Sequence, residues 1–476
     1  MASTQQIFPR FFPNLAFQKL IVTIAFPAML TNIATALFGL ADIWMIGRMG
    51  NPNMQGGVEI GARLLTTLCV IFNFLRSGTT ALTAQAAGQK TTPETPPQSL
   101  TETPWQEDEL GHPCRKTPNY QTERTLVRAV ALAISIGAFL LILKPVLLSC
   151  GLYLLDASGA VATQAQYYVA RRYWVIPLIL TNSVLSAWLI GIRRMRAVLI
   201  MEISSNFLHI ALDWIGVIIL GQGVRAVANA SVISEIFSTA FLLVMISRHI
   251  AFSQLPSLFK QTSTWHKQTI LDLFRLNRDL FIRTILLMSA ITLFTRMSVQ
   301  QGIVILAANA ILNQLFTLSV LILDGYESAA QILCGEAVGM NDKGYFFKIT
   351  QNLMIQSLSV ALVMALFYTF RSPFLMQTFT TDHRVIDIAT KNAFWLSLLP
   401  ILGVSSFVMD GVFVGAGWSR AMMFSMAGAS FLFTLSLTVM HGFGNYGLWL
   451  AYSLFYLFRS GLQLGLLPFL AKRQFT

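Results

Sequence analysis

Two aspartates in long apolar segments are the residues best placed to do chemistry. Asp42 is the one ionisable residue of the apolar run 21–46, and Asp213 lies in a later run, 197–220. A carboxylate within a membrane-spanning helix costs about 2.5–3.5 kcal/mol on insertion scales, so both side chains should face the protein interior. Two carboxylates at similar depth in a desolvated site cannot both ionise easily, which suits a pair that exchanges protons. We therefore predict that they carry protons; the alternative is two unrelated structural contacts.

Other polar residues accompany Asp213 at helical spacing. Glu202, Asn206, His209 and Asp213 are four, three and four residues apart, which places them on one face of a helix. Such a face points at one neighbouring helix or one cavity. We expect Asn206 and His209 to belong to the same site as Asp213.

Three more charged residues lie within apolar runs. Arg76 and Asp324 fall at matching positions in the two halves of the chain, so we predict that they meet near the axis between the halves. Because a buried arginine needs a partner, we interpret this pair as structural. Asp410 lies near the inner end of its run and is predicted to be a helix cap or part of an ion pair at an inner gate.

Three prolines lie inside apolar runs, where they can bend the helices that contain them. Pro27, Pro177 and Pro400 each free a carbonyl and bend the helix that contains them. Membrane helices also tolerate proline for ordinary packing reasons, so a hinge and a static bend both stay open as interpretations.

No catalytic or metal-binding pattern is present. The chain has no HExxH, GxSxG or GxxxxGK[ST] motif, and its four cysteines are scattered without a CxxC pair. These observations argue against an enzyme, a cofactor and a bound metal. Without a nucleotide site, transport would have to draw its energy from an ion gradient.

The composition is that of a polytopic membrane protein. Hydrophobic residues make up 55% of the 476 residues and charged residues only 11%. Because only helices satisfy their own backbone at these lengths, we predict an all-α bundle that contacts the lipid bilayer and no nucleic acid. The twelve predicted spans are 20–46, 60–87, 125–149, 168–190, 197–220, 224–247, 280–300, 303–339, 345–370, 386–415, 419–440 and 446–470.

The two halves of the chain repeat each other. The second span ends in AQAAG and the eighth in GEAVG, and glycine-rich turns recur after the fifth and eleventh spans. Six spans per half make the repeats parallel, related by a pseudo-twofold axis along the membrane normal. The predicted organisation is an N-terminal segment 1–19, a first lobe 20–247 with a disordered insertion at 89–123, a linker 248–279, and a second lobe 280–476. Residues 265–278 of the linker are predicted to form an amphipathic surface helix.

Positive charge predicts the orientation. With the N-terminus inside, twenty lysines and arginines fall on inner segments and seven on outer ones. This asymmetry predicts that both termini are cytoplasmic. We expect a monomer.

Four segments then carry a family resemblance. GLADIWMIGRMG, FNFLRSGTTALTAQAAG, AANAILNQL with LDGYESAAQILCGEAVG, and FVMDGVFVGAG resemble the multidrug and toxic compound extrusion (MATE) transporters, in their bacterial DinF-like branch. The resemblance covers nearly the whole chain outside the insertion. It implies a location in the inner membrane of a bacterium. It also implies cation-coupled efflux, in which protons or sodium enter while an amphiphilic, often cationic compound leaves. The family's first-lobe carboxylates fall on Asp42 and Asp213.

Three residues depart from the branch pattern. His209 stands where asparagine is usual, Phe38 where tyrosine is frequent, and Ser231 where threonine is usual. A sodium site needs hard oxygen ligands, which imidazole does not supply. The departures favour protons over sodium, with His209 sharing the titration.

The leading hypothesis is therefore a secondary antiporter that exports cationic amphiphilic drugs or toxins in exchange for protons. The alternative is a flippase for a lipid-linked saccharide or another anionic amphiphile. Flippases of that kind line their cavity with arginines, and Arg63, Arg76, Arg283 and Arg296 are the candidates.

The orientation predicts which loops a membrane-impermeant thiol reagent reaches in intact cells. In a background where the four native cysteines are serine, Thr101→Cys in the insertion should stay unlabelled and Thr381→Cys should label. Both should label after the membrane is permeabilised. Labelling of Thr101→Cys from outside would overturn the predicted orientation.

Overall fold

The structure is a computed structural model that describes residues 15–47, 52–89, 106–107, 113–114, 120–154, 159–250, 252 and 255–475. Within these residues, twelve helical segments are long and apolar enough to cross a membrane, as predicted. The strands that the described residues form are β1 (Gln106–Glu107) and β2 (Pro113–Cys114), a short antiparallel pair. Of the predicted disordered insertion 89–123, the structure also describes Gln89 and the residues from Tyr120 onward. The other residues of the insertion lie outside the described ranges.

The helices form two groups of corresponding elements. The first group consists of α1 (Leu15–Gly47), α2 (Pro52–Ile71), α3 (Phe74–Gly88), α4 (Tyr120–Leu154), α5 (Gly159–Arg172), α6 (Ile176–Gly191), α7 (Met195–Asp213) and α8 (Val224–Ser247). The short α9 (Leu255–Lys260) follows. The second group consists of α10 (Lys267–Gln300), α11 (Ile303–Gly339), α12 (Lys343–Phe379), α13 (His383–Lys391), α14 (Ala393–Gly415), α15 (Ser419–Val439) and α16 (Gly444–Gln474).

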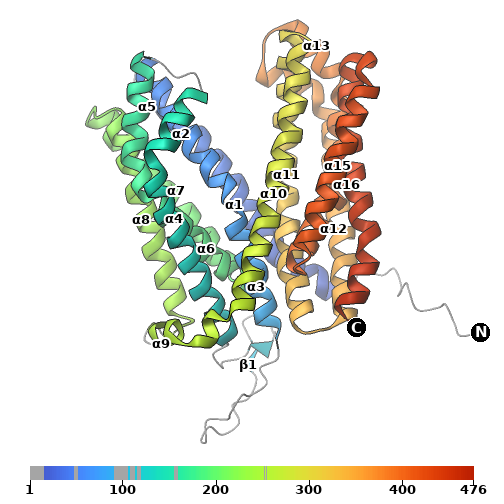
Figure 1. Cartoon of the computed structure of the whole chain (residues 1–476). Coiled ribbons are helices and arrows are strands. Elements are labelled where there is room, and N and C mark those ends of the chain that lie inside the picture. The colour runs from blue at the N-terminus through green and yellow to red at the C-terminus, as the bar shows by residue number, and fades with distance from the viewer. Residues whose placement is uncertain are drawn as a thin grey trace, which may run out of the picture.

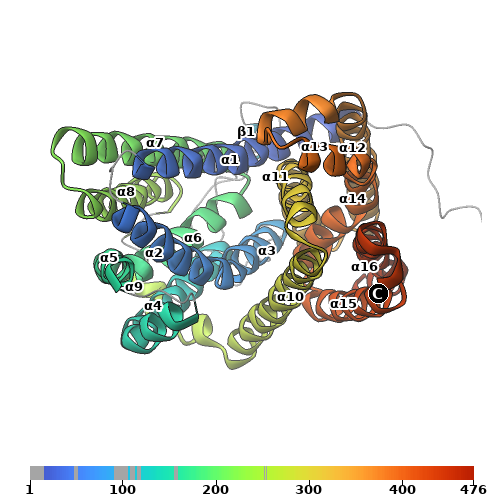
Figure 2. The ribbon, with the colours of Figure 1, turned by 90° about the horizontal axis from the view of Figure 1, so that it is seen from above.

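The two groups are two lobes that diverge toward one end of the molecule (Figures 1 and 2). In the first lobe α3, α4 and α6 contact one another, and in the second α11, α12 and α14 do the same. Each lobe has its own apolar core, and a third cluster joins both lobes at the opposite end. We call that joined end, which carries Gly88, Arg193 and Glu336, the closed end.

Three predicted spans are interrupted. The second breaks at Phe72 and Asn73 between α2 and α3, and the tenth divides into α13 and α14. The fourth breaks at a 3-10 turn, Tyr173–Val175, so Pro177 lies in the first turn of α6 and not inside a long helix. Proline in a first turn loses no helical hydrogen bond, which corrects the prediction of a bend there. Pro27 and Pro400 do lie inside α1 and α14.

The predicted surface helix at 265–278 does not exist as a separate element. Residues from Lys267 onward form the start of α10, which continues to Gln300. No glycine or proline interrupts this stretch, so the helix has no reason to end before the apolar span begins. The amphipathic face is therefore one end of a spanning helix.

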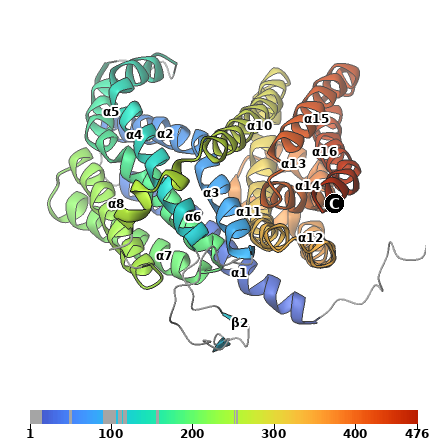
Figure 3. The same cartoon turned by 60° about the horizontal axis from the view of Figure 1, so that its bottom comes forward.

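Close approach of α3 and α11 joins the lobes at the closed end (Figure 3). A Cβ atom on Gly88 would lie 2.2 Å from the Glu336 carbonyl oxygen, and one on Gly339 would lie 2.1 Å from that of Gln85. These contacts require glycine because backbone meets backbone. The repeated AQAAG and GEAVG segments are thus the two sides of one interface.

Polar contacts reinforce this interface in a pseudo-symmetric way. Arg193, in the turn between α6 and α7, donates to both carboxylate oxygens of Glu336, with Nε 2.6 Å from Oε1. Burial lowers the pKa of Arg193, but the Glu336 carboxylate and the Tyr345 hydroxyl together raise it above its ordinary value. At the corresponding place Gln85 donates to the Gly415 carbonyl over 2.7 Å. Arg193 and Gly417 occupy matching turn positions, and both have positive φ, 63° and 78°.

Removing the Arg193–Glu336 pair should loosen the closed end. Arg193→Gln or Glu336→Gln loses charge-assisted hydrogen bonds, worth about 1.5 kcal/mol because the Arg193 side chain is 32% exposed. Spin labels placed on α3 and α11 should report roughly a tenfold larger population with the lobes separated there. The matched control is Arg194→Gln, since Arg194 is exposed and outside the interface. An unchanged distance distribution in both pair variants would show that the ion pair does not hold this end.

Candidate functional site

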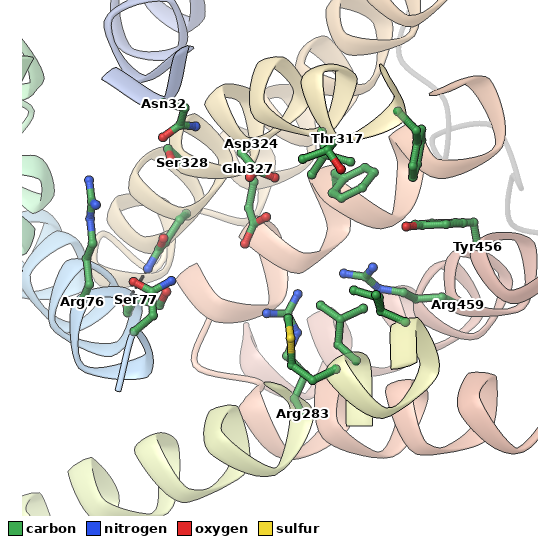
Figure 4. Close-up of a pocket in the computed structure, with 18 of the residues that line it drawn as sticks. Asn32, Arg76, Ser77, Arg283, Thr317, Asp324, Glu327, Ser328, Tyr456 and Arg459 are labelled. Carbon is green, nitrogen blue, oxygen red and sulfur yellow. Dashed lines mark hydrogen bonds between the residues drawn. The ribbon is translucent and has the colours of Figure 1, made fainter. Parts of the chain in front are cut away.

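A cavity of about 450 Å³ lies between the two lobes (Figure 4). Helices α1, α3, α6 and α7 contribute to one wall, and α10, α11, α14 and α16 to the other. Its charged lining residues are Arg76, Arg283, Asp324, Glu327 and Arg459. The volume lies within the range of pockets that hold drug-sized molecules.

Asp410 organises the wall on the second lobe. Its carboxylate is fully buried and accepts hydrogen bonds through Oδ2 from both Arg283 of α10 and Arg459 of α16. Gln463 Nε2 donates to the other oxygen over 2.6 Å. Asp410 was predicted to be a helix cap or part of an ion pair at an inner gate. In the structure it pairs with two arginines, and the group lies at the cavity wall. A carboxylate held by three donors is not available to a transported cation.

Asp324 and Glu327 face the cavity from α11 (Figure 4). They are three residues apart, which puts them on one face of the helix, and both are half-buried. Among the described residues no hydrogen bond or ion pair within 4 Å holds either carboxylate. Both are thus exposed to whatever the cavity contains.

Arg76 lines the cavity from α3, on the first lobe. The neighbouring Ser77 carbonyl accepts a hydrogen bond from Gln331 of α11, which links the two lobes beside the cavity. Arg76 and Asp324 share the cavity, but the ion pair predicted between them does not form in this structure, where none of the described acidic groups lies within 4 Å of Arg76. The structure thus places the two residues in one cavity without the predicted contact between them.

Aromatic rings make up the apolar part of the second-lobe wall. Tyr456 packs edge-on against Phe316, with ring centroids 5.4 Å apart, and Tyr452 lies beside both. Phe407 lies under the Arg459 guanidinium, 5.7 Å from its centre. This wall can accommodate the apolar body of an amphiphile.

The predicted coupling residues gather inside the first lobe. His209 Nε2 lies 3.4 Å from Asp213 Oδ2 and 3.4 Å from Ser231 Oγ, which joins α7 to α8. Asp213 and Ser231 are buried. Asn206 lies one turn away on the same helix, and the described residues offer its buried Nδ2 no hydrogen-bond acceptor. Asp42 lies on α1, but its side chain is outside what the structure describes.

A second polar group lies deeper in the same lobe. Asn182 of α6 donates to Glu235 Oε2 over 2.9 Å and accepts from Thr239 over 2.8 Å. Arg172 donates to the Tyr168 hydroxyl nearby over 2.5 Å. Glu235 and Asn182 lie on different helices, so the sequence alone does not identify this contact.

Sequence reasoning also missed Arg459, Gln463, Arg193 and Glu336. Arg459 is an isolated charge in an apolar run, so the criterion that selected Asp42 would have selected it too. Glu336 stands in the GEAVG segment, where the repeat could have identified it as an interface residue. Gln463 offered no signal.

Known proteins share this sequence and this architecture. The profile of the MatE family matches residues 27–96, 119–215 and 280–440. DNA damage-inducible protein F of Escherichia coli (strain K12) is 31% identical over 441 residues, which cover 93% of this chain and 90% of that protein.

Two solved structures have the same fold. One is the outward-facing conformation of a multidrug resistance MATE family transporter, with a TM-score of 0.79, 16% identity and 96% of both chains covered. The other is a MOP superfamily transporter from Pyrococcus furiosus, described as having a binding pocket of reverse polarity, with a TM-score of 0.80, 15% identity and 96% of both chains covered. From its family profile, its relatives and its twelve spans, the chain belongs to the MATE family of multidrug efflux transporters, which are membrane transporters and not enzymes.

Proposed function

We propose that this protein is a proton-coupled antiporter that exports small amphiphilic compounds carrying a positive charge. The observation that carries the proposal is the cavity between the lobes, which combines carboxylates with an aromatic wall and is sealed toward the closed end. Alternating access would follow if the lobes opened at the closed end while they came together at the opposite end. The relatives named above support an efflux role.

The closed end is proposed to face the cytoplasm. The α9 segment and the C-terminus lie at this end, together with the turn that carries Arg193 and Arg194 (Figure 1). Excess positive charge on these segments favours the cytoplasmic side. In that orientation the structure has its cavity closed to the inside, as after substrate has been released outward.

Proton coupling is proposed to act through Asp42, Asp213 and His209, with Asn206 and Ser231 as hydrogen-bonding partners. The 3.4 Å distance from His209 to Asp213 supports a shared titration, because imidazole and carboxylate at this distance affect each other's charge. Sodium would bind less well at this group, because the His209 imidazole occupies a position where an oxygen ligand would be needed.

Helix α1 is proposed to transmit protonation to the lobes. Gln356 of the second lobe donates to the Gln18 carbonyl over 3.0 Å, and Asn32 donates to the Leu321 carbonyl over 3.1 Å. Pro27 lies between these two attachments and removes a helical hydrogen bond there. Bending at Pro27 would therefore change how the first lobe sits against the second. We propose that Pro400 allows α14 to bend in the same way.

The flippase alternative has weaker support. Arg76, Arg283 and Arg459 line the cavity, but Arg63 and Arg296 are exposed and lie outside it. Asp410 already neutralises part of the positive charge at the second-lobe wall. A cavity of about 450 Å³ also suits a drug-sized molecule better than a lipid-linked saccharide.

Asp42→Asn should abolish transport driven by a pH gradient while leaving substrate binding intact. Asparagine imitates the protonated acid but cannot release the proton, so the driving force is uncoupled. The measurement is efflux from proteoliposomes under an imposed pH gradient, and separately under a sodium gradient. Asp213→Asn should lose efflux or shift its pH optimum, and His209→Asn should gain a response to sodium.

Asp272→Asn is the matched control, because this carboxylate lies on the exposed start of α10, far along the chain from the coupling group. It should transport at the wild-type rate. Normal pH-driven efflux by Asp42→Asn would show that Asp42 is a structural residue and that the coupling proposal is wrong.

A further inference from the structure

We propose that Glu235 and Glu202 form a proton pathway through the first lobe, from the coupling group at Asp213 to the cavity at Arg76. The inference rests on the proposed proton coupling and deepens it, because it names the residues that carry the proton onward. Both glutamates lie outside the coupling group, within the membrane-spanning helices α8 and α7. A carboxylate at this depth is costly, and chains of such groups relay protons in pumps and transporters.

The interface between α7 and α8 is polar along its length. At one end, Ser231 Oγ lies 3.4 Å from His209 Nε2. Further along, Ser205 Oγ donates to the Ser234 carbonyl over 3.2 Å, and Ser238 Oγ donates to Ser205 Oγ over 2.7 Å. All four serines are buried. Because a hydroxyl both donates and accepts hydrogen bonds, this interface can pass a proton where apolar side chains would block it.

Glu235 lies beside this interface, one residue after Ser234. Its Oε2 accepts a hydrogen bond from Asn182 Nδ2 of α6 over 2.9 Å. The charged and titratable groups around it are Arg172 at the end of α5, Glu202 of α7 and the Cys69 thiol of α2. Arg172 is also a charged neighbour of His209, so both titratable groups lie near one guanidinium. A proton on either group therefore changes the potential at the other.

Asn206 fills the interval between the coupling group and Glu202 on α7. It lies four residues after Glu202 and three before His209, on the same helical face. Its buried Nδ2 has no hydrogen-bond acceptor among the described residues. Buried polar groups of this kind are usually bonded to internal water, which can carry a proton between neighbours. The pathway from Asp213 to Glu202 is about 16 Å long at the rise of an α-helix.

Glu202 brings the pathway to the cavity. Its charged neighbours are Glu235 and Arg76, and Arg76 lines the cavity from α3 (Figure 4). An ionised Glu202 offsets the positive charge of Arg76, whereas a protonated Glu202 leaves that charge facing the cavity. A more positive wall weakens the binding of a cationic substrate. Arrival of a proton at Glu202 therefore favours substrate release, and by linkage a bound cation favours loss of the proton.

One proton moves at each step, and no other bond changes. Asp213 or His209 gives the proton to water beside Asn206. The Glu235 carboxylate accepts it and passes it to Glu202, and each donor returns to its earlier charge. The proton leaves Glu202 to water in the cavity. This electrostatic effect on Arg76 acts in addition to the bending of α1.

Transport of tetraphenylphosphonium, a lipophilic cation, tests the pathway. Its uptake into inverted proteoliposomes with an acidic interior is measured for the full-length protein. Glu235→Gln and Glu202→Gln should each slow uptake about tenfold or more, because a positioned proton carrier contributes roughly 100-fold or more to a proton transfer. Glu235→Asp and Glu202→Asp keep an acid and should retain part of the rate. Glu59→Gln is the matched control, since Glu59 is an exposed carboxylate of α2 in the same lobe, and it should transport at the wild-type rate.

Proton release on binding distinguishes a proton pathway from a structural role. Binding of tetraphenylphosphonium to the purified protein in nanodiscs is measured by calorimetry at several pH values, in buffers of different ionisation enthalpy. The wild type should bind more tightly as the pH rises and should release protons on binding. Glu202→Gln should bind at every pH with the affinity that the wild type has at low pH, and should release fewer protons. Glu59→Gln should behave as the wild type does.

Four results would overturn the pathway: wild-type uptake by either glutamine variant, a wild-type affinity that does not change with pH, an unchanged pH dependence in Glu202→Gln, or loss of cation binding in both glutamine variants. If one variant alone fails to bind the cation, the other decides. The antiport survives these results as long as the wild type responds to the pH gradient and Asp42→Asn does not. A wild type that ignores the gradient refutes the antiport and the pathway together.

Discussion

A charge within a membrane-spanning helix needs a counter-charge, and the second lobe is built around one solution to this constraint. Asp410 is fully buried on α14 and holds both Arg283 of α10 and Arg459 of α16. Removing Asp410 would leave two buried arginines without their carboxylate, which is far more destabilising than the cluster is stabilising. The ion cluster therefore ties three helices together, and it also forms the wall of the cavity.

The interface at the closed end combines strong and weak contacts. Arg193 and Glu336 form one charged contact, whereas the pseudo-symmetric contact between Gln85 and Gly415 is neutral. Tight backbone approach at Gly88 and Gly339 supplies the remaining complementarity. In the proposed alternating access this interface opens in each transport cycle, so it cannot be too stable, and a partly exposed ion pair is consistent with that requirement.

Sequence patterns predicted the architecture well and the contacts between helices poorly. Hydropathy and length identify spans, and the repeated AQAAG and GEAVG segments point to a shared interface, because these are properties of a single helix or of matching positions. The break at Phe72 and Asn73 gave no signal, since neither residue disfavours a helix strongly. Helical spacing placed His209 beside Asp213, but it could not show that Arg459 meets Asp410, because these residues lie on separate helices and the facing sides depend on the packing.

The two lobes differ in a way that bears on where an ion gradient can act. In the second lobe the buried carboxylate of Asp410 is held by two arginines and a glutamine, so a proton would have to displace strong contacts to bind there. In the first lobe Asp213 has an imidazole at 3.4 Å as its ion-pairing neighbour, and this group can itself release or accept a proton. In the proposed coupling, protonation of this group changes the charge of the first lobe, whereas Asp410 keeps its charge. In the proposed mechanism α1, which contacts both lobes, is the element through which protonation in the first lobe reaches the cavity.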